Sequence, residues 1–225
     1  GAGLEEALLP ALDNVDGKRL VIEASAGLES RPITGDAANG HDVANDGHGH
    51  EEGDPHFWLD PNLAIYYVET IRSGLTQVDP AGAEIYAANA TAYIAKLQTL
   101  DRWIREQIGT IPPDRRLLVT NHESFGYFAD RYGLKVIGTL STSVSAGAAP
   151  SAKQIAALVD QIRATGAPAI FLEQGVNPQL AEQVAAETGV QVVTGLYTHS
   201  LTASDGEAPT YIQMLRFNVT QIVTA

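Results

Sequence analysis

Residues 116–134 have the sequence RLLVTNHESFGYFADRYGL, in which a short apolar run passes through a polar turn into a helical pattern. An apolar run of this length, bounded by basic residues on one side and turn residues on the other, is typical of a buried strand. The pattern predicts a strand over Arg116–Thr120 and a helix from about Ser124.

The same order of strand and helix recurs to the end of the chain. Further strands are predicted at 135–140, 169–172 and 190–194, with helices that begin near Ser151, Pro178 and Pro209. Alternating strands and helices indicate an α/β fold, in which a parallel sheet is covered by helices on both faces. Ligands bind such sheets at the carboxyl ends of the strands.

The first half of the chain is predicted to be mainly helical. Leu4 to Leu12 have helical spacing, and a strand-forming run follows at residues 19–23. Asp60 followed by Pro61 is typical of a helix start, and the helical pattern continues to about Val78.

A second helical pattern runs from about Ala81 to Ile108, which is long for a globular protein. Helices of this length often connect two lobes. We therefore predict an N-terminal lobe over residues 1–80, a connecting helix over 81–111 and a C-terminal lobe over 112–225, each lobe built on a parallel sheet flanked by helices.

Composition restricts the chemistry. The chain is 44% hydrophobic and 18% charged, which is typical of a soluble globular protein, and no apolar run is long enough to span a membrane. No signal sequence is present in the first residues.

Cysteine is absent, so a transition metal would have to be bound by imidazole and carboxylate. The net charge of −13 argues against nucleic acid as a partner.

Three histidines that are distant in sequence are candidates for one metal site. His122 follows the strand LLVT, His199 follows the predicted strand near 190–194, and Glu173 ends the run AIFL, so all three lie at one edge of the sheet. His56 comes from the other side of the long helix, so a site that includes it lies between two lobes. Neutral imidazole suits zinc, with copper, nickel and iron as alternatives.

A loop at residues 41–54, HDVANDGHGHEEGD, holds the other three histidines. His41, His48 and His50 could form an auxiliary site of low affinity that collects metal, or they could be part of a solvated linker. Composition alone leaves both interpretations open.

Several stretches together resemble a known family. These stretches are DPHFWLDP at 54–61, LLVTNHESFGYFADRYGL at 117–134, IFLEQGVNPQLAEQVAAETG at 170–189 and LYTHSLTASDGEAPTYIQMLRFNV at 196–219. They resemble the cluster A-I substrate-binding proteins of bacterial ABC importers for zinc and manganese. The resemblance covers essentially the whole chain, although family members begin with a further stretch that supplies a first histidine ligand, which we expect upstream of Gly1.

The resemblance implies that two α/β lobes are joined by one long rigid helix and that the metal is held in the cleft between them by His56, His122 and His199. The family usually has an aspartate where this chain has His199, and imidazole in its place favours zinc over manganese. Asp205 is an alternative ligand. Glu173 is either a ligand or an acceptor that orients a ligand histidine, and we favour the acceptor.

The resemblance further implies a monomeric, non-enzymatic protein that captures zinc and delivers it to a membrane permease. It would act in the periplasm or otherwise outside the cytoplasm, with or without a lipid anchor.

Two alternatives stay open. One is a zinc-dependent hydrolase, in which three histidines leave a position for water and Glu123 or Glu173 acts as the base. The other is a metal-binding adhesin or chaperone on the same scaffold.

Overall fold

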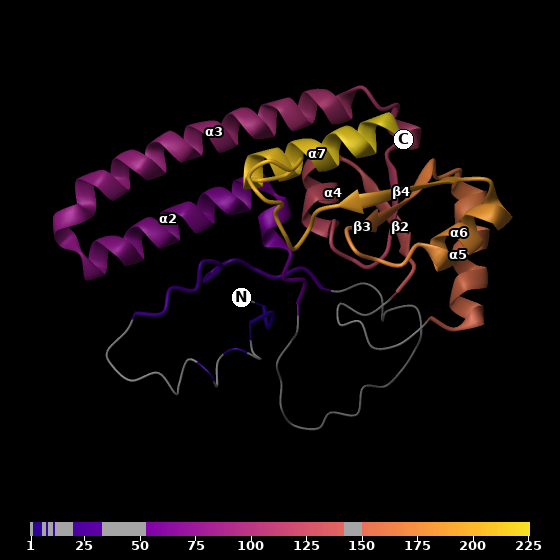
Figure 1. Cartoon of the computed structure of the whole chain (residues 1–225), viewed down its shortest axis with the longest axis horizontal. Coiled ribbons are helices and arrows are strands. Elements are labelled where there is room, and N and C mark those ends of the chain that lie inside the picture. The colour runs from indigo at the N-terminus through magenta and orange to yellow at the C-terminus, as the bar shows by residue number, and fades with distance from the viewer. Residues whose placement is uncertain (1, 6–7, 9–10, 12–19, 33–52, 142–149) are drawn as a thin grey trace. The chain divides into compact units, whose positions relative to one another are not determined.

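The structure is a computed structural model that describes residues 2–5, 8, 11, 20–32, 53–141 and 150–225. The chain divides into two compact units, an N-terminal unit, Gly1–Asp101, and a C-terminal unit, Arg102–Ala225. Figure 1 labels most of the helices and strands of both units. The boundary between the units falls inside one long helix, α3 (Ala83–Gly109). The helix itself is the one that the apolar pattern from Ala81 to Ile108 predicts.

The regular elements in the described part of the N-terminal unit are helices. It contains η3 (Phe57–Leu59), α2 (Pro61–Val78), η4 (Pro80–Gly82) and most of α3. Helix α2 begins at the predicted place because the Asp60 side chain accepts a hydrogen bond from the backbone N–H of Asn62 and proline occupies the first helical position. The Asn62 side chain also donates to Oδ1 of Asp101 in α3 at 2.9 Å, which ties the start of one helix to the other.

The strand predicted over residues 19–23 is not formed in its described part, residues 20–23. Residues 20–23 are irregular, and the only pairing in the described part of this unit is an isolated antiparallel bridge between Arg31 and Asp54. A strand needs a neighbouring strand to satisfy its backbone groups, and the described residues of this unit offer none. Residues 2–5 form a turn, and most of the helix predicted over 4–12 lies outside the described residues.

The C-terminal unit holds a four-stranded parallel sheet with the order β2-β1-β3-β4. The strands are β1 (Leu117–Thr120), β2 (Lys135–Thr139), β3 (Ala169–Glu173) and β4 (Gln191–Leu196). The helices are α4 (Gly126–Tyr132), α5 (Ala152–Thr165), α6 (Gln179–Thr188) and α7 (Tyr211–Thr224), and the short η5 (Pro113–Arg115) precedes β1. All four predicted strands and the helices that follow them are therefore confirmed.

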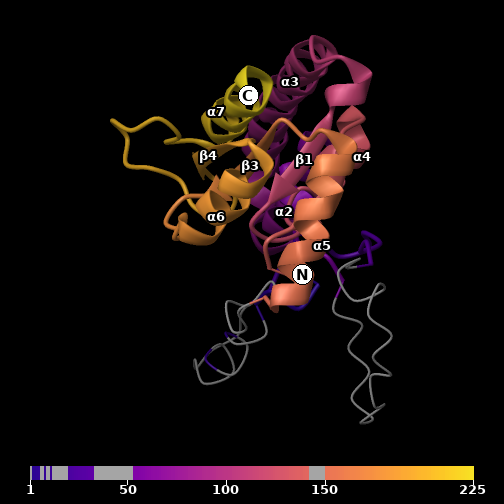
Figure 2. The ribbon, with the colours of Figure 1, turned by 90° about the vertical axis from the view of Figure 1, so that its right-hand side faces the viewer.

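Residues of β3 alternate between two buried faces. Ile170 and Leu172 belong to a core formed with α5 and α6, which includes Val159 and Val184. Phe171 points to the opposite face and is also fully buried. Figure 2 shows α6 and α7 on opposite sides of β3 and β4. Because both faces are covered, side chains that follow the strands are accessible mainly at the strand ends. Among the described residues, no helix is both long and apolar enough to cross a membrane.

Candidate metal site

His56 is held by a carboxylate within the N-terminal unit. It directly precedes η3 and is fully buried. Its backbone N–H donates to Oδ1 of Asp54 at 2.9 Å, and its ring Nδ1 lies 2.7 Å from the same oxygen. Because Nδ1 faces the carboxylate, a metal would bind at Nε2, and the buried carboxylate makes the imidazole a stronger electron donor to that metal.

Asp54 is itself fixed by a segment that comes earlier in the chain. Its backbone N–H donates to the carbonyl of Arg31 at 2.8 Å, and the Arg31 guanidinium lies 3.8 Å from its second carboxylate oxygen. The hydroxyl of Ser30 donates to the Asp54 carbonyl at 3.0 Å. Residues 30–31 therefore hold Asp54, the first residue of the DPH motif (residues 54–56), in place. Asp54 in turn orients His56, the last residue of the motif.

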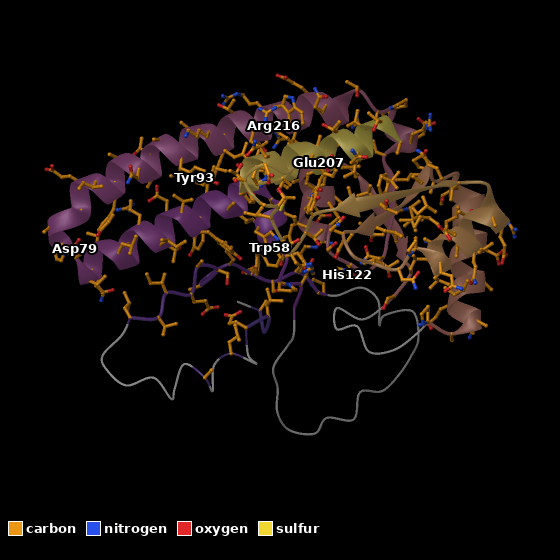
Figure 3. All side chains as sticks on the ribbon, viewed as in Figure 1. Trp58, Asp79, Tyr93, His122, Glu207 and Arg216 are labelled. Atoms are coloured by element: carbon orange, nitrogen blue, oxygen red, sulfur yellow. The ribbon has the colours of Figure 1, made fainter. Side chains whose placement is uncertain are left out.

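His122 and His199 lie together in the C-terminal unit, as their positions after β1 and β4 predict. Their rings are stacked, with centroids 5.6 Å apart and planes at 23°. Figure 3 labels His122 just beyond the sheet. The His122 side chain is 10% exposed, whereas that of His199 is 41% exposed. Two of the three candidate ligands are therefore adjacent within the C-terminal unit.

Glu173 at the end of β3 faces both rings. Its Oε1 lies 3.2 Å from Nδ1 of His122, and its Oε2 lies 3.6 Å from Nδ1 of His199. Oε1 also accepts a hydrogen bond from the hydroxyl of the buried Ser124 at 3.0 Å. One carboxylate therefore faces Nδ1 of both imidazoles. A hydrogen-bond acceptor in this position would orient the Nε2 atom of each ring toward a metal.

The pKa of Glu173 is lowered from its ordinary value. Burial of the carboxyl by itself raises the pKa, but this effect is outweighed by a hydrogen bond with His199, by the charge of His122 and by a hydrogen bond with Thr198. The side chain is therefore a carboxylate at neutral pH, and it adds negative charge where a cation would bind.

Two neighbouring polar residues complete the surroundings of the rings. Asn121 accepts a hydrogen bond from the Glu173 backbone N–H at 2.9 Å, so its amide nitrogen faces Nδ1 of His122, at 2.8 Å. Thr198 Oγ1 lies 2.9 Å from Nδ1 of His199. Nδ1 of His122 thus has both a donor and an acceptor beside it, and it can accept from Asn121 or donate to Glu173 according to which ring nitrogen carries the proton.

The remaining predicted residues are Asp205 and the three histidines of the loop at 41–54. Asp205 is exposed in the loop between β4 and α7. His41, His48 and His50 lie outside the described residues. Sequence reasoning did not single out Asp54, Asn121, Ser124, Thr198 or Asn218, all of which contact the candidate ligands or the backbone next to them. Proximity in sequence was the available signal for Asp54, Asn121, Ser124 and Thr198, each of which lies within two residues of a candidate ligand histidine.

Comparison with known proteins identifies the family of this chain. The family described as "Zinc-uptake complex component A periplasmic" matches residues 1–225. The chain belongs to this family. The resemblance inferred from DPHFWLDP and NHESFGYF is therefore confirmed.

Individual members of the zinc-uptake component A family differ in the metal for which they are named. The manganese-binding lipoprotein MntA of Halalkalibacterium halodurans is 34% identical over all of this chain, and the match covers 69% of its own length. The zinc-binding lipoprotein AdcA of Streptococcus pneumoniae is 34% identical over 92% of this chain, which corresponds to 41% of AdcA.

A solved structure shares the fold. The periplasmic zinc-binding protein TroA of Treponema pallidum superposes with a TM-score of 0.81 at 27% identity, covering all of this chain and 78% of TroA. The α/β fold with a parallel sheet flanked by helices, predicted from the sequence, is confirmed by this match and by the sheet itself.

Proposed function

We propose that this chain captures zinc outside the cytoplasm and delivers it to the membrane permease of an ABC importer. The observation that carries the proposal is the carboxylate on the Nδ1 side of each candidate ligand, Asp54 for His56 and Glu173 for both His122 and His199. Histidines that bind metals almost always have such an acceptor on the other ring nitrogen. Relatives that bear the names of metal-binding lipoproteins support the same class of function.

The proposed ligand set is His56, His122 and His199. In this proposal, α3 connects an N-terminal lobe, residues 1–80, to a C-terminal lobe, residues 112–225, and one ion takes ligands from both. Glu173 acts as an acceptor rather than as a ligand, and Asp205, six residues beyond His199, stays outside the set. The protein acts as a monomer.

Zinc is proposed over manganese because the three donors are imidazoles. Manganese prefers carboxylate, carbonyl and water oxygens, whereas imidazole suits zinc. Named relatives include both a manganese-binding and a zinc-binding lipoprotein, so the names of relatives do not favour either metal. The choice of zinc therefore rests on the three imidazole donors of this chain. The hydrolase and the adhesin or chaperone are not proposed, because the matched relatives carry the names of binding and uptake proteins.

Isothermal titration of the metal-free protein with zinc and with manganese tests the proposal. We expect one tight zinc site, weaker manganese binding, and a large loss of zinc affinity when any of His56, His122 or His199 is replaced by alanine. X-ray absorption of the zinc-loaded protein should give Zn–N distances of about 2.0–2.1 Å. The matched control replaces His41, His48 and His50 together by alanine, and the tight site should persist. Absence of zinc binding at micromolar concentration would overturn the proposal.

A further inference from the structure

The side-chain amide of Asn218 on α7 forms two hydrogen bonds with the backbone of one residue, Tyr197. Its Oδ1 accepts a hydrogen bond from the backbone N–H of Tyr197 at 2.9 Å, and its Nδ2 donates to the Tyr197 carbonyl at 2.6 Å. Asn218 is 1% exposed. A polar side chain buried this deeply is costly unless it is paired, and here both of its hydrogen-bonding groups have partners.

The location of Tyr197 explains why its backbone needs such a partner. β4 is at the edge of the sheet and ends at Leu196, whose carbonyl accepts from the Gln174 backbone N–H at 2.8 Å. Tyr197 lies one residue beyond the strand. The amide of Asn218 presents one donor and one acceptor, as a neighbouring strand would, and so pairs the backbone where the sheet has ended.

The next two residues lead directly into the candidate metal site. Thr198 is 3% exposed and contacts Nδ1 of His199, and the same nitrogen lies 3.6 Å from Glu173. His199 itself is 41% exposed, so packing around its own side chain restrains it less than it restrains the buried His122. The direction in which the backbone leaves Tyr197 therefore determines where the His199 ring lies.

We infer that Asn218 is a positioning residue for His199 as a metal ligand. The inference rests on the proposed zinc-binding function and deepens it. Asn218 acts through the Tyr197 backbone and does not touch the ion. Without its amide, the Tyr197 N–H and C=O lose their partners, and the segment that carries His199 loses its fixed direction.

Zinc titration of the whole protein tests this inference with a double-mutant cycle. We expect Asn218→Ala to weaken zinc binding by about tenfold or more, in the range found for residues that orient metal ligands. In a His199→Ala background, Asn218→Ala should cause almost no further loss, because the residue through which it acts is already gone. An equal loss in both backgrounds would overturn the inference.

Val219→Ala is the matched control, because Val219 is a neighbouring, fully buried residue of α7. It should lower the melting temperature and leave zinc affinity unchanged, which separates general destabilisation from positioning. A loss of affinity equal to that of Asn218→Ala would contradict the inference. If Asn218→Ala does not fold, Asn218→Asp takes its place in the cycle, since Asp keeps the acceptor for the Tyr197 N–H and removes the donor.

The wild-type titration separates the two proposals. If the wild-type protein binds no zinc, the proposed function fails and this inference fails with it. If the wild-type protein binds zinc and Asn218→Ala binds it equally well, only the positioning role of Asn218 is overturned.

Discussion

Nδ1 of His56 lies 2.7 Å from Oδ1 of Asp54, and both side chains are almost completely buried. The two residues are separated only by Pro55, so the DPH motif contains both a candidate metal ligand and the carboxylate that orients it. A carboxylate in this position fixes the ring orientation and raises the basicity of Nε2.

Replacement of Asp54 by asparagine should weaken zinc binding by about 10- to 100-fold, because the amide retains the shape but loses the charge. Isothermal titration measures the change. Asp79→Asn is the matched control in the same unit, since Asp79 caps η4 and accepts from Tyr86 without contacting a histidine. Equal affinities for wild type and Asp54→Asn would show that the carboxylate does not tune the ligand.

Glu173→Gln should weaken zinc binding by a similar factor of about 10 to 100. Glutamine has one acceptor oxygen where glutamate has two, so it cannot serve the Nδ1 atoms of His122 and His199 equally. Glu182→Gln on α6 makes the same chemical change in the first turn of a helix and should leave the affinity unchanged. If Glu173 were instead a direct ligand, X-ray absorption of the wild-type protein would show an additional oxygen at the zinc.

The lowered pKa of Glu173 predicts the sign of a pH effect in the metal-free protein. Because the folded pKa lies below the ordinary value of 4.5, the ionised carboxylate stabilises the fold above that pH. This contribution is lost as the pH falls through the folded pKa. The difference in the free energy of unfolding between wild type and Glu173→Gln should therefore shrink below about pH 4.5, as measured by urea unfolding. A difference that grows on acidification would contradict the pKa shift.

His199→Asp should move metal preference from zinc toward manganese. Aspartate adds a hard oxygen donor and a negative charge in place of imidazole. We expect the ratio of zinc to manganese affinity to fall by at least about tenfold, equivalent to about 1.4 kcal/mol. Competition titrations with both metals measure the ratio. His199→Asn is the control, because it supplies an oxygen donor without the charge. If the affinity ratio were unchanged in His199→Asp, the imidazole of His199 would no longer be a reason to favour zinc over manganese.

Ser151→Ala should lower stability without affecting metal binding. Ser151 caps α5 in a reciprocal arrangement with Gln154, and loss of such a cap costs about 1 kcal/mol. Thermal and urea unfolding measure the loss, and zinc titration at a temperature where the variant is folded should match the wild type. Ser73→Ala, at a helix-interior position of α2, should not reproduce the loss of stability.

Local patterns were sufficient to predict much of the fold. Strand β1 and the start of α2 follow from an apolar run and from the Asp60-Pro61 signal, since both depend on residues adjacent in sequence. The run at 19–23 has the same local character, but its described residues, 20–23, form no strand, because pairing depends on a neighbour that local sequence does not supply.

The order of strands and helices, the start of α2 at Asp60-Pro61 and the availability of imidazole without thiolate could all be predicted from the amino-acid sequence. The position of His122, Glu173 and His199 at one end of a parallel sheet could be predicted as well, because strand ends of a βα series share an edge. Which buried polar groups meet depends instead on tertiary packing. Asn218 is 21 residues from Tyr197, and Ser124 is 49 residues from Glu173. Helical and strand periodicity act over neighbouring residues, whereas a hydrogen bond between distant segments depends on how α7 and the sheet pack in three dimensions.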